Sequence, residues 1–246
     1  MPTDLLLLSG NDIPFAEAQV SIHQPTLKEV AYIGEECFFT GYQMLKVNKN
    51  NIKTEGKNNL DDLTNFDILI AILKERNAVM QKNRNCVFMV LSLLFPSYAI
   101  TINKEGIVLK KEENEEKHII DKVNFDIFQR ILLEMFAFDK QEDAKEEFNP
   151  DGQMASRIAE KIRKRHEKLA QIKGNSTKID IISRYASILA IGLQINLTDV
   201  MNYTVYQLFD QQRRMQLKTQ YDITISARLA GAKDVEDPQD WMADIH

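Results

Sequence analysis

The prediction of the fold class depends on one stretch of sequence, Tyr98-Ala-Ile-Thr-Ile-Asn-Lys-Glu-Gly-Ile-Val-Leu109. Apolar and polar residues alternate at its two ends, around a turn-forming Asn103-Lys-Glu-Gly106, which is the pattern of a β-hairpin. His118–Ile120 predicts a third short strand. Helical patterns dominate elsewhere, so we predict a mainly α protein with a small β part: an N-terminal α+β region with this hairpin, then an all-helical C-terminal region.

The first residues of the chain predict short strands followed by a helix. We expect a buried strand at Leu5–Leu8 and a second strand at Val20–Ile22. Thr26 and Glu29 match the capping-box pattern, so a helix should begin there, although Gly34 weakens its middle.

Two further helical segments are expected before the hairpin. Thr64 and Asp67 cap a helix that runs to about Lys82. Asn83–Asn85 then break it, and Cys86–Phe95 follows as a buried helical segment.

The chain after the hairpin is expected to be helical and to divide at one break. A helix should run from Asn124 to near Phe138, and Asn149-Pro-Asp-Gly152 marks the break. We therefore predict an α+β region at 1–148, a helical region at 149–231 and an acidic tail at 232–246. The helices expected in the second region are Met154–Lys173, Lys178–Gln194 and a long one from Thr204 to Gly231.

The composition excludes several classes of protein. Hydrophobic residues make up 44% and charged residues 27% of the 246 residues, which is typical of a globular chain. The net charge of -5 argues against general nucleic-acid binding, which normally uses a basic surface. No signal-peptide pattern surrounds Leu5–Leu8, and the longest apolar run, Cys86–Phe95, is about half of a membrane span, so we expect a cytoplasmic protein.

Motifs for catalysis, cofactors and metals are missing from the sequence. It contains no glycine-rich phosphate loop, no paired-histidine zinc helix and no Gly-x-Ser-x-Gly motif. The four histidines are far apart, and Cys37 and Cys86 lie in apolar contexts typical of buried, reduced thiols. We therefore predict that the protein is not an enzyme and has no cofactor or metal ion.

The strongest charge feature is the helix expected at Met154–Lys173. One of its sides is apolar, and its other sides are basic, with the candidate partner-binding residues Arg157, Lys161, Lys164, Arg165 and Lys168. Three interpretations are open: a solvated helix packed on its own protein, a helix that docks an acidic or helical partner, or a contact with nucleic acid. The third lacks the interleaved aromatic residues that stack on bases.

The long final helix and the acidic tail carry the other candidate partner-binding residues. Tyr206, Arg213 and Arg214 lie near the start of this helix, where most apolar residues are expected in the core. Trp241 is the single tryptophan of the chain and lies in the tail. Tryptophan, tyrosine and arginine are favoured at interfaces, and folding back on its own domain is the alternative for Trp241.

Three parts of the sequence form a recognisable set. They are Pro25-Thr-Leu-Lys-Glu-Val-Ala-Tyr-Ile-Gly-Glu-Glu-Cys-Phe-Phe39, Leu93-Leu-Phe-Pro-Ser-Tyr98, and Tyr203-Thr-Val-Tyr-Gln-Leu-Phe-Asp210 with Leu229–Ala232 and Asp240–Met242. Together they resemble tail-assembly chaperone-like proteins of long-tailed bacteriophages. The resemblance implies a small helical protein, made in the bacterial host cytoplasm during phage morphogenesis. It also implies that the protein binds the tape-measure protein and recruits tail-tube subunits.

We therefore expect a non-enzymatic assembly chaperone or adaptor that binds a protein with helical or coiled-coil segments. We expect no membrane partner, and self-association is open. A structural virion component, such as a head or connector subunit, is the first alternative. A nucleic-acid-associated factor that uses Arg157–Lys173 is the second.

Overall fold

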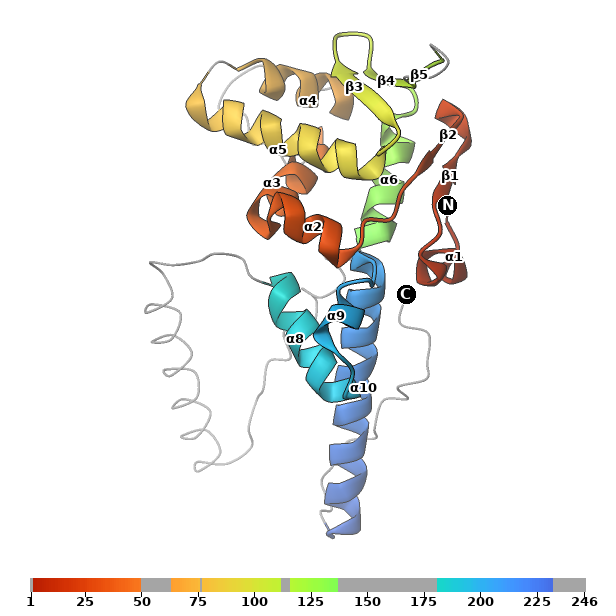
Figure 1. Cartoon of the computed structure of the whole chain (residues 1–246), viewed down its shortest axis with the longest axis vertical. Coiled ribbons are helices and arrows are strands. Elements are labelled where there is room, and N and C mark those ends of the chain that lie inside the picture. The colour runs from red at the N-terminus through yellow and green to blue at the C-terminus, as the bar shows by residue number, and fades with distance from the viewer. Residues whose placement is uncertain (1, 50–62, 76, 112–115, 137–180, 232–246) are drawn as a thin grey trace.

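The computed structural model describes residues 2–49, 63–75, 77–111, 116–136 and 181–231. Within these residues, helices pack together with two small antiparallel sheets, and the last helix, α10 (Val205–Leu229), extends away from the rest of the molecule (Figure 1). The predicted fold class is confirmed: the protein is mainly α, and its strands lie in the N-terminal half.

The N-terminus forms a helix where the sequence predicted a buried strand, so that prediction was wrong. Leu5–Leu8 belongs to α1 (Asp4–Ser9), which begins where the Thr3 hydroxyl accepts a hydrogen bond from the backbone N–H of Leu6. Gly10 ends this helix in a left-handed conformation with a φ of 71°. Leu7 is buried and Leu5 is exposed, so only one side of this short helix faces the core.

The second predicted strand is confirmed as β2 (Val20–Ile22), and it pairs with β1 (Ile13–Phe15). A turn of 3-10 helix, η1 (Ala16–Ala18), connects the two strands. Every second residue of each strand is buried, as a half-buried strand requires. The sequence analysis did not predict β1, because Pro14 stands in its middle and proline is unusual there.

The helix predicted from Thr26 is divided in two at Gly34. Thr26 and Glu29 form the expected capping box at the start of α2 (Leu27–Ile33). Gly34 adopts a φ of 86°, which ends α2, and α3 (Glu35–Leu45) begins at the next residue.

The boundary between the next two helices lies earlier in the chain than the sequence predicted. α4 (Asn65–Lys74) has the predicted capping box of Thr64 and Asp67, but it ends well before Lys82. α5 (Ala78–Leu94) begins after Asn77, whose side chain accepts a hydrogen bond from the N–H of Met80. It continues without a break through residues 83–85, and Asn83 and Arg84 are half-buried there while Asn85 is exposed.

The predicted hairpin is confirmed as β3 (Tyr98–Ile102) and β4 (Ile107–Lys111), which pair in antiparallel register. In the turn, the Asn103 side chain accepts hydrogen bonds from the N–H groups of Glu105 and Gly106. The predicted third strand is β5 (Lys117–Ile120), and it pairs with β4 to give the strand order β3-β4-β5.

The remaining helices lie where the sequence predicted them. α6 (Phe125–Phe136) falls within the helix predicted from Asn124. α8 (Ile181–Leu193) and α10 (Val205–Leu229) match the last two predicted helices, and the short α9 (Leu197–Val200) connects them. The predictions that lie outside the described residues are the break at 149–152, the helix at Met154–Lys173 and the acidic tail at 232–246.

One hydrophobic core joins the described parts of the two predicted regions. Val205 and Phe209 of α10 belong to the same buried cluster as the core residues of the N-terminal elements. In this cluster the Phe136 ring of α6 lies 5.1 Å from the rings of both Phe38 and Tyr42 in α3. The last helices are therefore attached to the N-terminal elements by shared packing as well as by the chain.

The packing of α3 against α5 depends on Gly41. A Cβ atom at this position would lie 2.5 Å from the carbonyl oxygen of Cys86 and 2.6 Å from Cγ2 of Val90. Contacts this short do not occur, so the missing side chain is what lets the two helix backbones approach each other.

Gly41→Ala should therefore destabilise the protein by about 1–3 kcal/mol, because the added methyl group pushes α3 away from the backbone of α5. Gly192→Ala in α8 is the matched control, since its added Cβ meets the flexible end of Met215 at Sδ. Urea unfolding followed by circular dichroism gives both free energies of unfolding. Equal losses for the two variants would contradict the special role of Gly41.

Candidate protein-binding surface

The start of α10 is held against the N-terminal elements by backbone hydrogen bonds. Residues 25–28 and 201–205 run antiparallel to each other, and we call this pair of segments the junction. The N–H of Leu27 donates to the carbonyl oxygen of Tyr203 over 2.9 Å. Because each segment leads directly into a helix, the junction sets where α2 and α10 begin relative to each other.

Each segment of the junction also contains the N-cap residue of a helix. Thr26 caps α2, and Thr204 caps α10 in a capping box completed by Gln207. The Gln207 side-chain amide reaches further and donates a hydrogen bond of 2.7 Å to the carbonyl oxygen of Leu8 at the end of α1. The first turn of α10 is thus bound to α1 and, through the junction, to α2.

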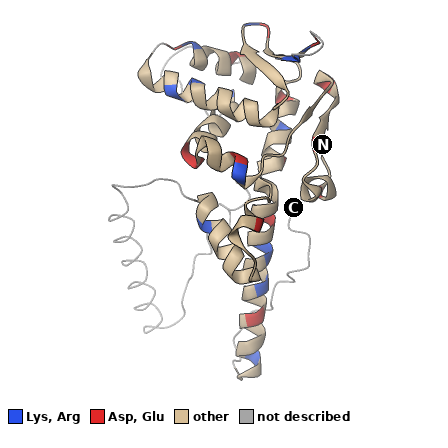
Figure 2. Cartoon of the chain, viewed as in Figure 1, with Lys and Arg blue, Asp and Glu red and all other residues tan. Residues whose placement is uncertain are grey.

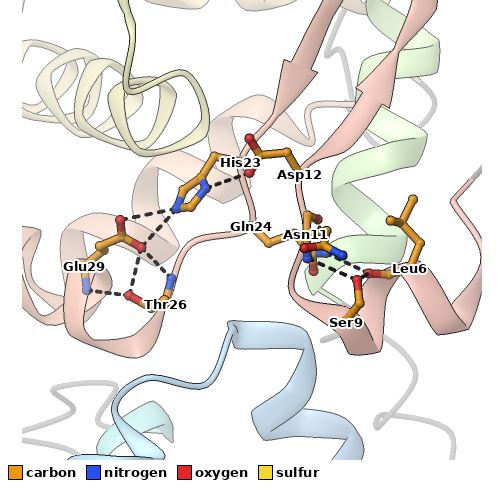
Figure 3. Close-up of polar contacts among 8 residues, drawn as sticks. All are labelled: Leu6, Ser9, Asn11, Asp12, His23, Gln24, Thr26 and Glu29. Carbon is orange, nitrogen blue, oxygen red and sulfur yellow. Dashed lines mark hydrogen bonds and ion pairs between the residues drawn. The ribbon is translucent and has the colours of Figure 1, made fainter.

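His23 lies beside the junction, between two carboxylates (Figure 3). Its Nδ1 is 2.9 Å from Oδ1 of Asp12, and its Nε2 is 3.2 Å from Oε2 of Glu29. The same Glu29 oxygen accepts hydrogen bonds from the N–H and the hydroxyl of Thr26, over 2.7 and 2.8 Å. Burial disfavours the charged imidazole, but the hydrogen bonds with Asp12 and Glu29 outweigh it and raise the pKa of His23.

α8 packs along the first half of α10 and runs in the same direction. The ring of Tyr185 lies 5.5 Å from that of Phe209, and further along Gly192 lies against Met215. α10 then continues beyond the end of α8 to Leu229, over roughly 20 Å of helix (Figure 1). Much of this second half is exposed to solvent.

A group of large apolar side chains on α8 and α9 is also exposed. We define the α8–α9 patch as Ile188, Ile191, Leu193 and Leu197, which are 40% to 79% exposed. Ile188 and Ile191 lie on one side of α8, whereas Ile182 and Leu189 on the other side are buried. Exposed apolar side chains grouped in this way are typical of a surface that binds another protein.

Charges of both signs alternate along α10 (Figure 2). Nε of Arg214 lies 3.2 Å from both oxygens of the buried Asp210, one turn earlier. Lys218 pairs with Asp222 over 2.6 Å. Arg214 and Lys218 of α10 are therefore each paired with a carboxylate of the same helix.

The structure describes Tyr206, Arg213 and Arg214 among the predicted partner-binding residues. Tyr206 is 2% exposed and packs inside the chain. Arg213 and Arg214 are half-buried near the start of α10. The predicted residues that lie outside the described part are Arg157, Lys161, Lys164, Arg165, Lys168 and Trp241.

The sequence analysis missed the α8–α9 patch. The available signal was that α8 is apolar on more sides than one contact can bury, with isoleucines at 181, 182, 188 and 191. A helix of this kind is either enclosed by its own protein or has a side left for a partner. The position of α10 decides between the two.

Residues 178–246 match the family model of the YomV second domain. That family is phage-derived, from a Bacillus prophage. The match includes α8, α9 and α10 with the α8–α9 patch, so this part of the chain is similar to a phage domain. No curated protein and no solved structure matches the chain.

The described residues hold no group of three or more His, Cys, Asp or Glu side chains placed to bind a metal ion. None of their helices is both long enough and apolar enough to cross a bilayer. Cys37 and Cys86 are free thiols, and burial raises the pKa of Cys37 to about 12, which keeps it protonated and weakly nucleophilic at neutral pH.

The raised pKa of His23 predicts that stability depends on pH. A pKa that is raised in the folded state makes its full contribution to stability when the pH is below the pKa of the unfolded chain, 6.5. This contribution is lost as the pH rises through the pKa of the folded state. The wild type should therefore exceed His23→Gln in free energy of unfolding by more at about pH 6 than at about pH 9. Urea unfolding of both proteins at the two pH values measures this. A difference that does not change with pH would contradict the ion pairs of His23.

Proposed function

We propose that this chain is a non-enzymatic, protein-binding assembly chaperone or adaptor of phage morphogenesis that acts in the host cytoplasm. The observation that carries the proposal is the exposed α8–α9 patch, within a segment that is similar to a phage-derived domain. The earlier resemblance to tail-assembly chaperone-like proteins points to tail tape-measure and tube proteins as the partners.

The chemistry of the patch favours a helical partner. Its side chains are branched and aliphatic, and Arg184 is the charged residue beside them on the exposed side of α8. Burial of one isoleucine or leucine side chain stabilises a complex by about 1.5–3 kcal/mol. An amphipathic helix that places apolar side chains three and four residues apart can cover such a surface.

The projecting half of α10 also carries exposed apolar side chains. Ile223 and Leu229 are 58% and 85% exposed, and they lie beyond the part of α10 that α8 covers. A partner can therefore contact α10 as well as α8. Long tape-measure helices carry apolar stripes that aggregate when they are uncovered, and a rod-like surface of this kind would shield them.

The test is co-expression with the tape-measure protein of the genome that encodes this chain. Replacing both Ile188 and Ile191 by Ser should lower the binding affinity roughly tenfold or more, because both side chains lose their apolar contact. Replacing Leu5 and Val123 by Ser is the matched control, since these residues are 78% and 77% exposed but lie on other elements. Affinity purification followed by a binding titration measures the difference.

Three outcomes would overturn the proposal or redirect it. Equal binding by the two double variants would remove the patch from the interface. Detection of the chain in purified virions by mass spectrometry would favour a structural virion component. Binding to DNA or RNA that weakens steeply with salt would favour a nucleic-acid-associated factor.

A further inference from the structure

A pocket opens between α4, α5 and the turn of the β3–β4 hairpin, and it shares no element with the α8–α9 patch. Its volume is about 510 Å³. Its lining combines apolar side chains (Ile70, Leu73, Phe88 and Ile102) with the three cations Lys74, Arg84 and Lys104, and Asn103 completes it. Since no acidic side chain is among these lining residues, the pocket favours a ligand that is both anionic and apolar.

Arg84 in this pocket has an unused hydrogen-bond donor. Its Nη2 donates to the carbonyl oxygen of Leu73. Its Nε is buried and has no hydrogen-bond partner among the described residues. A buried charged donor without an acceptor is unfavourable, and a ligand carboxylate beside the guanidinium would offset its positive charge.

We propose that this pocket binds the acidic C-terminal segment, residues 232–246, of a second copy of this chain. The segment is complementary to the pocket in charge and carries apolar side chains: Asp240 precedes Trp241, Met242 follows it, and the other acidic residues are Asp234, Glu236, Asp237 and Asp244. The indole enters the apolar part beside Phe88, and the neighbouring carboxylates reach the three cations. An indole also attracts guanidinium and ammonium groups directly.

The free edge of β3 favours an extended segment at this place. In the part of the chain that the structure describes, β3 pairs with β4 along one edge, and no strand pairs with its other edge. Ile102, the last residue of β3, lines the pocket. A segment that enters along this edge can add backbone hydrogen bonds to those of its side chains.

The chain that follows α10 is too short to bring its own Trp241 to the pocket, so the segment comes from a second copy. Trp241 is the tenth residue after Gly231, so it lies at most about 35 Å from the end of α10. α10 itself is roughly 37 Å long. α4, α5 and β3 lie beyond the start of α10, at the opposite end of the molecule from its free end (Figure 1). Trp241 of the same chain therefore does not reach the pocket.

The single tryptophan makes docking directly measurable. A synthetic peptide of residues 232–246 is titrated with the full chain carrying Trp241→Ala, which contains no other tryptophan. We expect a saturable blue shift of the peptide's emission as its indole becomes buried. Adding Lys74→Glu and Lys104→Glu to the chain should weaken binding roughly tenfold or more. No saturable shift would overturn the proposal.

The control is a second double variant, which has the same net charge as the first but leaves the pocket intact. Lys28→Glu and Lys117→Glu reverse two exposed lysines outside the pocket, and this double variant should bind the peptide as tightly as the parent. Circular dichroism and urea unfolding confirm that both double variants are folded. Equal weakening by the two pairs would mean that net charge alone drives binding, which overturns the pocket as the site.

Mixing two defective chains tests the second-copy assignment. Sedimentation velocity should show self-association of the wild type but monomers for Trp241→Ala alone and for the Lys74→Glu, Lys104→Glu double variant alone. A mixture of the two variants should associate, because one supplies the segment and the other the pocket. A wild type that stays monomeric while the peptide binds would overturn the assignment. Since neither variant touches the α8–α9 patch, this failure is distinct from failure of the proposed chaperone function.

Discussion

The antiparallel junction between residues 25–28 and 201–205 is the contact on which the rest of the architecture depends. It joins segments that are far apart in the sequence, and each segment ends in a threonine cap that starts a helix. The Glu29 carboxylate that completes the first cap is also held by His23. A local cap, a long-range backbone contact and the partly exposed pair of His23 and Glu29 therefore stabilise one another, and together they set the direction of α10.

The last helices are buried close to the junction and exposed further away from it. The first turns of α10 pack in the shared core, where Tyr206 and Phe209 are buried. α8 needs α10 to bury Leu189 and Ile182, but this contact covers one side of α8 only. The α8–α9 patch and the far half of α10 are thus exposed as a consequence of how the helices are attached, and a partner can bind them without opening the core.

The elements that local chemistry determines could be predicted from the sequence, and those that depend on distant contacts could not. The capping boxes at Thr26, Thr64 and Thr204 and the Asn103 turn involve residues within a few positions, so their patterns indicated the helices and the hairpin. The leucine run in α1 fits a strand or a helix equally, and its packing decides the outcome. The α8–α9 patch, likewise, becomes visible only when α10 shows which side of α8 it covers.

The two surfaces lie on different elements, and they imply different kinds of contact. A C-terminal segment in the pocket of another copy is a heterologous contact, because the two copies use different surfaces, and such contacts repeat from copy to copy unless a ring closes. The α8–α9 patch takes no part in that contact, so it stays available in every copy. Several chains joined in this way would present a series of apolar patches, which suits a partner whose long helices repeat the same stripe along their length.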